Sequence, residues 1–285
     1  MTIQTILLGM GYTFARAATL GFDIISLMML RLSGSSLLMF LLWKISGETP
    51  IEMSKLKSKL PSLLFLACIG ILMNQFCFML GLKLTTPASS SLLYALTPMI
   101  AFCFSAWYFH SEQFTRKKLL SILLALAGVV IVILARFQEQ GNGALGGNFI
   151  TLVAVLMWSL YISFSRPLLQ IFPPIQLTLI IMLIGTVCFM PFGISSILEF
   201  PFSTVSNEEW FGLGYIIAVN SVIGYWLLMF SLTKAPSSEV SIFINAQPLV
   251  AAVFSYFYNG ETISALVAVG GGLILAGIWF MNQKH

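Results

Sequence analysis

The side chains that could carry chemistry in this sequence include a few amides set inside long apolar stretches. Asn74 and Gln75 are adjacent in one stretch, Asn220 lies in a later one, and Asn245 and Gln247 lie in another. A side-chain amide without partners costs several kcal/mol in an apolar medium. We therefore expect these amides to face the protein interior, where they hydrogen-bond either to neighbouring helices or to a polar solute.

Aromatic rings occupy the middle of the same stretches. Tyr94, Trp158, Tyr161 and Tyr225 could offer flat walls and hydroxyl groups to an amphiphilic or aromatic solute, and Thr97 adds a further hydroxyl. Packing within the protein is the alternative role for each ring. Together with the amides, these residues indicate non-covalent binding of a small molecule.

Two charged side chains in or beside the apolar stretches are candidates for handling charge. Arg31 lies about a third of the way along one stretch, and an arginine near the centre of a membrane span costs roughly 2.5–3.5 kcal/mol. It either contacts an anion or has a structural role. Glu239 begins a later stretch, with Lys234 nearby. It could bind a substrate amine or a coupling proton, and extension to the membrane interface is the alternative.

Two prolines, Pro98 and Pro248, fall inside apolar stretches. A proline has no N–H and displaces the carbonyl four residues before it, so the Tyr94 and Ile244 carbonyls should lose their usual partners. We interpret both prolines as helix kinks that open a binding site near the middle of the membrane. The alternative is that they only shape helix packing.

The sequence lacks the groups that catalysis requires. It has two histidines, no phosphate-binding Gly-x-x-x-x-Gly-Lys, no His-Glu-x-x-His and no cluster of carboxylates within an apolar stretch. Its four cysteines are consistent with small core residues and indicate neither disulfides nor a metal site. We predict no catalytic residue, no metal and no cofactor. The net charge of +4 is scattered over short loops, which is not the pattern of nucleic-acid binding.

The composition indicates that lipid surrounds these residues. Of the 285 residues, 58% are hydrophobic and only 8% are charged, whereas soluble proteins carry roughly a quarter charged residues. In lipid every backbone polar group must be satisfied within the structure, which favours helices. The continuous apolar run Leu119–Leu134 argues against the alternating pattern of a β-barrel.

A span needs about 20 apolar residues, and this length predicts ten membrane-spanning helices. Two of them have marked beginnings, a capping box formed by Ser206 with Glu209 and the pair Pro173-Pro174. Near the helix ends, ten lysine and arginine residues fall on one side of the membrane and three on the other. Basic residues favour the cytoplasmic side, which places both termini in the cytoplasm. The helices cover residues 3–20, 24–43, 60–82, 85–108, 117–135, 147–167, 175–197, 210–232, 236–258 and 263–281.

The chain also contains an internal repeat, because residues 81–134 resemble residues 230–280. Pro87 matches Pro236 at an offset of 149, and Leu126-Ala127-Gly128 recurs as Leu275-Ala276-Gly277 at the same offset. We expect five helices in each copy. An odd number means that the second copy enters the membrane upside down, an arrangement typical of secondary transporters.

The repeat predicts which residues of the two halves face each other. Pairing Leu82 with Leu232, at an offset of 150, sets Gln75 opposite Tyr225 on the walls of one cavity. The predicted organisation is a first five-helix repeat over residues 1–135, a periplasmic linker over 136–146 and a second, inverted repeat over 147–285.

At these motifs the sequence resembles the EamA type of the drug/metabolite transporter superfamily. The likeness rests on two stretches that run from Thr86-Pro87 or Ala235-Pro236 through an internal proline and a glutamate to Leu-Ala-Gly, and on Met157–Tyr161. Met10–Tyr12, at the matching place in the first repeat, lacks the usual tryptophan. The resemblance covers nearly the whole chain. It implies ten helices in two inverted repeats and alternating-access movement of metabolites, amino acids or drugs, usually outward.

We therefore expect an all-α integral membrane protein of a bacterial inner membrane that moves a small organic metabolite. Its expected partners are the solute, the lipid bilayer and, where transport is coupled, a proton. Small residues of the fifth and tenth helices are compatible with a homodimer. The alternatives are a passive facilitator or channel, a non-transporting sensor or lipid-handling protein, and a membrane-embedded enzyme.

Overall fold

The computed structural model describes residues 2–108, 115–140, 142–234, 240, 247–260 and 263–282, and every regular element within these ranges is a helix. Large apolar side chains such as Ile45 (83% exposed) and Leu198 (80% exposed) cover the outside, as a lipid-facing surface requires. The chain is an all-helical membrane protein. Seven described segments are long and apolar enough to span a bilayer: Ile24–Ser46, Met53–Leu84, Pro87–Phe104, Arg116–Ala135, Gly143–Leu168, Pro174–Glu199 and Asn207–Lys234.

The first half of the chain runs from α1 to α7. The elements in order are α1 (Thr2–Gly21), α2 (Ile24–Ser46), α3 (Met53–Leu66), the π-helix η1 (Ala67–Met73), α4 (Asn74–Leu84), α5 (Pro87–Tyr94), α6 (Thr97–Trp107) and α7 (Arg116–Gln140). The helix α2 begins where the Asp23 carboxylate accepts hydrogen bonds from the backbone N–H groups of Ile25 and Ser26, and it ends at Gly47, whose φ of 67° suits glycine.

The second half runs from α8 to α14. Its elements are α8 (Asn142–Leu168), α9 (Pro174–Glu199), the 3₁₀-helix η2 (Phe202–Thr204), α10 (Asn207–Tyr215), the π-helix η3 (Ile216–Gly224), α11 (Tyr225–Lys234), α13 (Gln247–Asn259) and α14 (Ala265–Asn282). The predicted capping box of Ser206 and Glu209 is confirmed at the start of α10, and α9 begins at Pro174 as expected.

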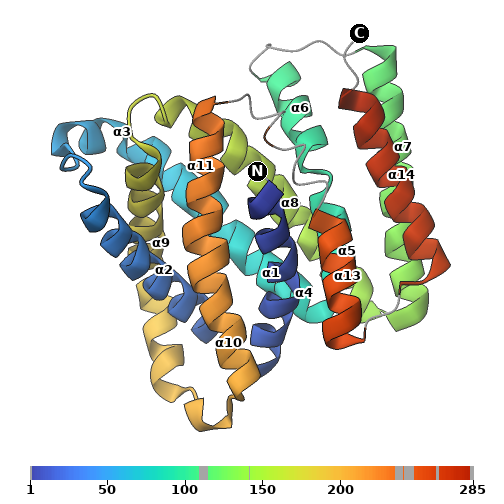
Figure 1. The fold of residues 1–285 in the computed structure, drawn as a ribbon, viewed down its shortest axis with the longest axis horizontal. Coiled ribbons are helices and arrows are strands. Elements are labelled where there is room, and N and C mark those ends of the chain that lie inside the picture. The colour runs from blue at the N-terminus through green and yellow to red at the C-terminus, as the bar shows by residue number, and fades with distance from the viewer. Residues whose placement is uncertain are drawn as a thin grey trace.

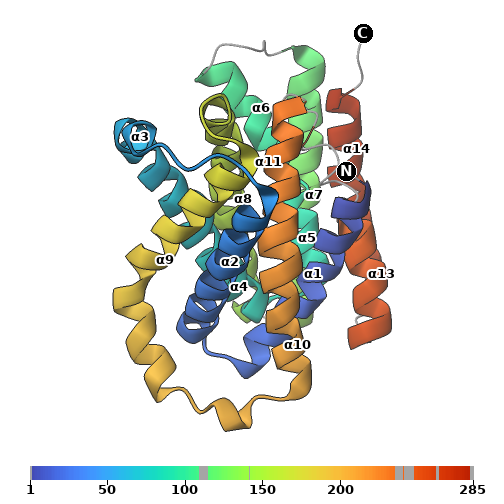
Figure 2. The same cartoon turned by 60° about the vertical axis from the view of Figure 1, so that its left-hand side comes forward.

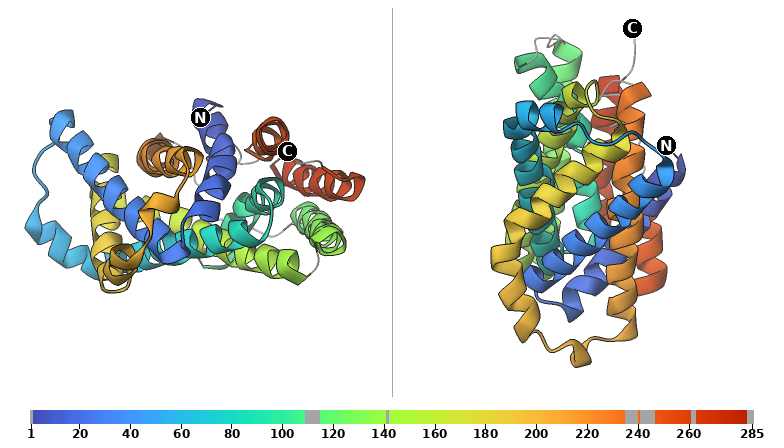
Figure 3. Two further views of the ribbon diagram at one scale, coloured as in Figure 1. Left: turned by 90° about the horizontal axis from the view of Figure 1, so that it is seen from below. Right: turned by 90° about the vertical axis from the view of Figure 1, so that its left-hand side faces the viewer.

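The helices pair across the two halves of the chain. Along the long axis of the molecule α2 packs against α9 at one end, and α7 packs against α14 at the other (Figure 1). Figure 2 shows α2 beside α9 after a 60° turn, and both pairs remain neighbours when seen from below in Figure 3. Between these ends α4 packs on α8, and α1 packs on α10 and α13.

Small residues allow α7 and α14 to approach closely. A Cβ added at Gly128 would lie 2.5 Å from the Gly270 carbonyl oxygen, and one added at Gly277 would lie 2.6 Å from the Ser121 carbonyl oxygen. A Cβ added at Gly272 would meet no heavy atom of another helix within 4 Å. The contact of α14 with α7 therefore uses Gly270 and Gly277.

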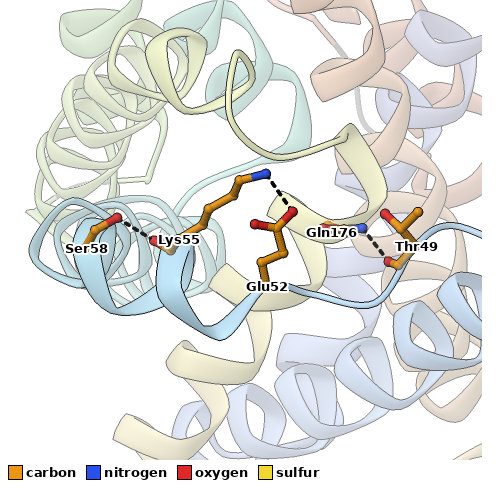
Figure 4. A network of polar contacts seen from close by, with 5 residues as sticks. All are labelled: Thr49, Glu52, Lys55, Ser58 and Gln176. Carbon is orange, nitrogen blue, oxygen red and sulfur yellow. Dashed lines mark hydrogen bonds and ion pairs between the residues drawn. The ribbon is translucent and has the colours of Figure 1, made fainter.

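Polar contacts also fix the connection between α2 and α3 (Figure 4). The Gln176 side chain of α9 donates a hydrogen bond to the Thr49 carbonyl at 2.8 Å, and Lys55 forms an ion pair with Glu52 at 2.8 Å. Both charged side chains are exposed, so the ion pair contributes little, about 0–1 kcal/mol. The contact from Gln176 holds this loop against the start of α9.

The structure adds detail to two predicted segments. The apolar stretch 85–108 contains two helices, α5 and α6, which meet at a turn formed by Ala95 and Leu96, within the apolar span Pro87–Phe104. The segment 136–146, expected as a linker, is helical where it is described, because α7 continues to Gln140 and α8 begins at Asn142. Polar residues at the end of a membrane helix can extend it into water, so the apolar run underestimates its length.

Candidate functional site

A cavity of about 760 Å³, counting the space at its mouth, lies between the two halves of the chain. Nine of its lining residues precede position 135 and seven follow it. They are Gln4, Thr5, Leu8, Tyr12, Arg31, Asn74, Gln75, Phe78, Tyr94, Trp158, Asn220, Gly224, Tyr225, Leu228, Val240 and Gln247. This mixture of apolar walls and a few convergent polar groups is typical of sites that bind small molecules.

Two groups of aromatic rings form part of the walls. Phe78 of α4 stands edge-on to Tyr12 of α1 and to Tyr94 of α5, with ring centroids 5.5 Å apart in each case. From the second half, the Trp158 and Tyr225 rings lie 5.2 Å apart, also edge to face. Edge-to-face contacts of this kind favour defined ring orientations.

Adjacent amides on α4 connect to both halves. Asn74 donates from Nδ2 to the Tyr94 hydroxyl at 2.9 Å and to the Ala154 carbonyl of α8 at 2.8 Å. Gln75 donates from Nε2 to the Tyr225 hydroxyl at 3.1 Å. The Tyr225 hydroxyl in turn donates to the Gly70 carbonyl at 3.4 Å. The expected pairing of Gln75 and Tyr225 is therefore a direct hydrogen bond across the cavity wall.

The two π-helices supply polar groups next to the cavity. A π turn widens the helix and leaves backbone carbonyls open to side-chain donors. The Gly224 carbonyl of η3 accepts from Gln4 at 3.0 Å, and the Gly70 carbonyl of η1 accepts from Tyr225. Asn220 of η3 presses so closely on Gly11 of α1 that a Cβ there would overlap its amide. Each π segment thus contacts helices of the opposite half.

Arg31 brings a buried charge to the cavity. Its side chain is 4% exposed, and its Nε donates to the Ser221 hydroxyl of η3 at 2.9 Å. Its Nη1 is buried without a hydrogen-bond partner. Within the described ranges no aspartate or glutamate lines the cavity and Arg31 forms no ion pair. An unpaired buried charge is costly and is typically retained for function.

The structure brings together most of the residues that the sequence singled out. Those that line the cavity are Arg31, Asn74, Gln75, Tyr94, Trp158, Tyr225 and Gln247. Tyr161 is buried behind the wall, stacked on Trp158 at 5.3 Å. Thr97 is also fully buried and donates to the Tyr94 carbonyl at 2.6 Å. Asn245 and Glu239 lie outside the described residues.

Pro98 lies directly after an irregular turn in its membrane span. It is the second residue of α6, and the two residues between α5 and α6 keep right-handed helical angles, with φ −61° and ψ −17° at Ala95 and φ −70° and ψ −13° at Leu96. The two helices follow one another within the span Pro87–Phe104, so the interpretation of Pro98 as a kink stays a prediction. The Tyr94 carbonyl that its ring frees is the one that Thr97 satisfies. Pro248 follows Gln247, where the described part of α13 begins, and the residues before it lie outside the described ranges, so its predicted role is not tested.

Sequence reasoning missed the contribution of α1. Gln4, Leu8 and Tyr12 follow one another at intervals of four residues and all line the cavity. Tyr12 also donates to Gln247 at 3.4 Å. The spacing of four places them on one face of a helix, and the polar residues Gln4 and Tyr12 on that face were the available signal. Arg16, on the same helix, donates to the Leu82 carbonyl at 2.6 Å near the end of α4.

The comparisons with known proteins agree on a class. The model of the EamA-like transporter family matches residues 1–134 and again residues 145–283. An uncharacterized transporter of Bacillus subtilis, YyaM, is 26% identical over 80% of this chain and 75% of its own. A probable amino-acid metabolite efflux pump of Salmonella typhimurium is 26% identical over 78% of this chain and 77% of its own.

One crystal structure of a protein shares the fold, with a TM-score of 0.70 at 19% sequence identity, over 99% of this chain and 95% of the other. The chain belongs to the EamA-like transporter family. It is a multi-pass membrane transporter rather than an enzyme, which agrees with the sequence-based expectation.

Proposed function

We propose that this protein is a secondary active transporter that moves a small organic metabolite, such as an amino acid or a related compound, outward by alternating access. The observation that carries the proposal is the cavity, because residues of both halves of the chain line it. Rocking of one half against the other would then expose the same residues first to one side of the membrane and then to the other. The efflux pump from Salmonella typhimurium supports the direction and the solute class.

We further propose that the chain consists of two inverted five-helix repeats, residues 1–135 and 147–285, joined by residues 136–146. The family model matches twice, over residues 1–134 and 145–283. The π-helices η1 and η3 begin 149 residues apart, as do α7 and α14. Helix contacts recur in the same way, because η1 packs on α8 as η3 packs on α1, and α6 packs on α8 as α13 packs on α1. These equivalences support a twofold relation.

The proposed location is a bacterial inner membrane with both termini in the cytoplasm. In Figure 1, α1 begins and α14 ends toward the upper side of the bundle, where α7 also begins and α11 ends. The start of α7 carries Arg116, Lys117 and Lys118, and the end of α11 carries Lys234. Basic residues gather on the cytoplasmic side of membrane proteins, which supports this orientation. Tags that report the two termini on opposite faces would overturn it.

The test of transport uses purified protein in lipid vesicles and a panel of amino acids and related metabolites. We expect at least one solute to accumulate when a pH gradient is imposed, and to equilibrate without accumulation when it is absent. Equal movement under both conditions would indicate a passive facilitator instead. No movement of any solute in either direction would contradict transport and favour a sensor or lipid-handling protein.

A further inference from the structure

Three polar groups that line the cavity are buried without partners. They are Nη1 of Arg31, Oε1 of Gln75 and Oδ1 of Asn220. Their side chains are 4%, 2% and 9% exposed, so water reaches them poorly. Buried polar atoms in folded proteins are nearly always paired, and each exception calls for an explanation. One cationic donor and two neutral acceptors facing one cavity form a consistent pattern.

The donor is held in place by the second half of the chain. The Nε of Arg31 is bound to the Ser221 hydroxyl, which itself donates to the Ile216 carbonyl, five residues back in the π-helix η3. This tether fixes the guanidinium plane. The remaining edge, with Nη1, is left for a ligand. A guanidinium pairs best with a planar, two-oxygen anion, and a carboxylate is the smallest organic group of that kind.

The acceptors are amide oxygens, and the orientation of the Gln75 amide follows from its neighbours. The Tyr225 hydroxyl uses its proton on the Gly70 carbonyl, so it accepts from Gln75, and the NH₂ group of Gln75 must face it. The opposite end of that amide, Oε1, is therefore the free acceptor. The Asn220 oxygen adjoins Ser221 in sequence and so belongs to the same segment of η3 that holds Arg31. Neutral oxygens of this kind accept hydrogen bonds from an ammonium group.

We infer that the cavity binds a dipolar solute, with its carboxylate on Arg31 and its ammonium group on the amide oxygens of Gln75 and Asn220. The rest of the solute then lies against the rings of Tyr12, Phe78 and Trp158 and the aliphatic side chains of Leu8 and Leu228. This inference rests on the proposed function, because it assigns the solute class of the same cavity. It also explains why a buried arginine needs no acidic partner in the described part of the protein: the solute supplies the counter-charge.

The first arm of the test changes the solute. Equilibrium binding to the purified wild-type protein is measured for L-alanine, L-leucine and L-phenylalanine, each compared with its carboxamide and with the matching carboxylic acid that lacks the amino group. We expect at least one amino acid to bind, and both of its analogues to bind roughly tenfold or more weakly, because each loses one charge-assisted contact. Equal binding of an amino acid and its carboxamide would overturn the inference, as would no binding by any amino acid.

The second arm changes the protein. Arg31→Gln should abolish the preference for the amino acid over its carboxamide, whereas Lys55→Gln, which removes one exposed positive charge elsewhere, should preserve it. Arg31→Lys keeps a charge but loses the planar fork and should bind with intermediate affinity. If Arg31→Gln fails to fold, the Arg31→Lys variant and the solute series on the wild-type protein still test whether Arg31 binds the carboxylate. Unchanged preference in a folded Arg31→Gln variant would show that the arginine is only structural.

The two proposals fail in different ways. Vesicles that accumulate solutes without a carboxylate, with no binding of amino acids, would overturn the inference and leave transport standing. Amino acids that bind with the expected dependence on Arg31 but never cross the membrane would overturn the transport proposal and leave the inference standing.

Discussion

Gln75 and Tyr225 are 150 residues apart, yet the amide of one donates to the hydroxyl of the other at 3.1 Å. The same separation recurs between Ser36 of α2 and Thr186 of α9, whose hydroxyls lie 2.8 Å apart. On the two-repeat proposal, residues separated by about the offset of the repeat meet in the interior. That is the geometry expected along a twofold axis, where equivalent positions of the two halves come face to face.

The hydrogen bond between Gln75 and Tyr225 should contribute to stability. In membrane proteins such bonds contribute on average about 0.6 kcal/mol and at most about 1.7 kcal/mol. Gln75→Leu and Tyr225→Phe should each lower stability, and the double variant should lose less than the sum. Unfolding in lipid measures this coupling. Tyr256→Phe, at an exposed ring, is the matched control; strictly additive losses would show that the two side chains are not coupled.

The break between α5 and α6 should matter for turnover more than for insertion. Pro98→Ala restores a backbone N–H, so the two helices can join and the Tyr94 carbonyl regains its usual partner. We expect a lower transport rate at a similar amount of protein in the membrane, and the same for Pro248→Ala. Pro61→Ala, at an exposed proline within α3, is the control. Wild-type rates in both variants would leave these prolines a packing role only.

Much of the fold could be predicted, because hydrophobic length and helix-capping residues are local signals. The beginnings of α9 and α10 at Pro174 and Ser206 are examples. The two-residue turn before Thr97 could not be read in the same way. The sequence shows that Pro98 frees the Tyr94 carbonyl, but not which group satisfies that carbonyl. Here the neighbouring Thr97 hydroxyl does so.

The close contact of α7 with α14 should tolerate no added side chain on its inner face. Gly128→Val would force a Cβ to 2.5 Å from the Gly270 carbonyl oxygen, and overpacking of this kind costs roughly 1–3 kcal/mol. Gly272→Val faces open space on the same helix pair and should be neutral. Thermal unfolding in detergent compares the two. Equal stability of both variants would contradict the close approach.

Asp23 should stabilise the start of α2 in its charged form. Partial burial raises the pKa of this carboxyl, but hydrogen bonds from Ser26, Ser196 and Ile25 outweigh burial and hold the pKa below its ordinary value. A lowered folded-state pKa means that the stabilisation is present above the ordinary pKa and is lost as pH falls through the lowered one. Asp23→Ala should cost about 1 kcal/mol near neutral pH. Stability measured from pH 7 to pH 3 checks this, with Asp23→Asn, which can still cap the helix, as control.

Glu239 is the candidate for proton coupling and lies outside the described residues. If its carboxyl carries the coupling proton, Glu239→Gln should remove the response of transport to an imposed pH gradient while the protein remains folded. Vesicle flux at several pH gradients gives the measurement, with Glu199→Gln, at the end of α9, as the matched control. An unchanged response would remove Glu239 from the coupling mechanism.

The candidate site could be predicted in its residue types but not in its contacts. Asn74, Gln75 and Tyr225 stand out because polar groups are rare and costly in apolar helices. Nothing local shows that Thr97 and Tyr161 are not among the residues lining the cavity, since which face of a helix is inward depends on its neighbours. The π-helices add to the difficulty, because a π turn rotates the residues after it relative to an α-helical register.

The paired π-helices also bear on how the protein arose. A π turn holds an extra residue compared with the α turn it replaces, and it is the mark of a small insertion. Ala67 and Ile216 begin the two π segments at equivalent positions, so on the two-repeat proposal the insertion is older than the gene fusion. The ancestor would then have been a single five-helix chain that already carried this irregular turn, and two copies of it, inserted in opposite directions, would have enclosed the pathway between them.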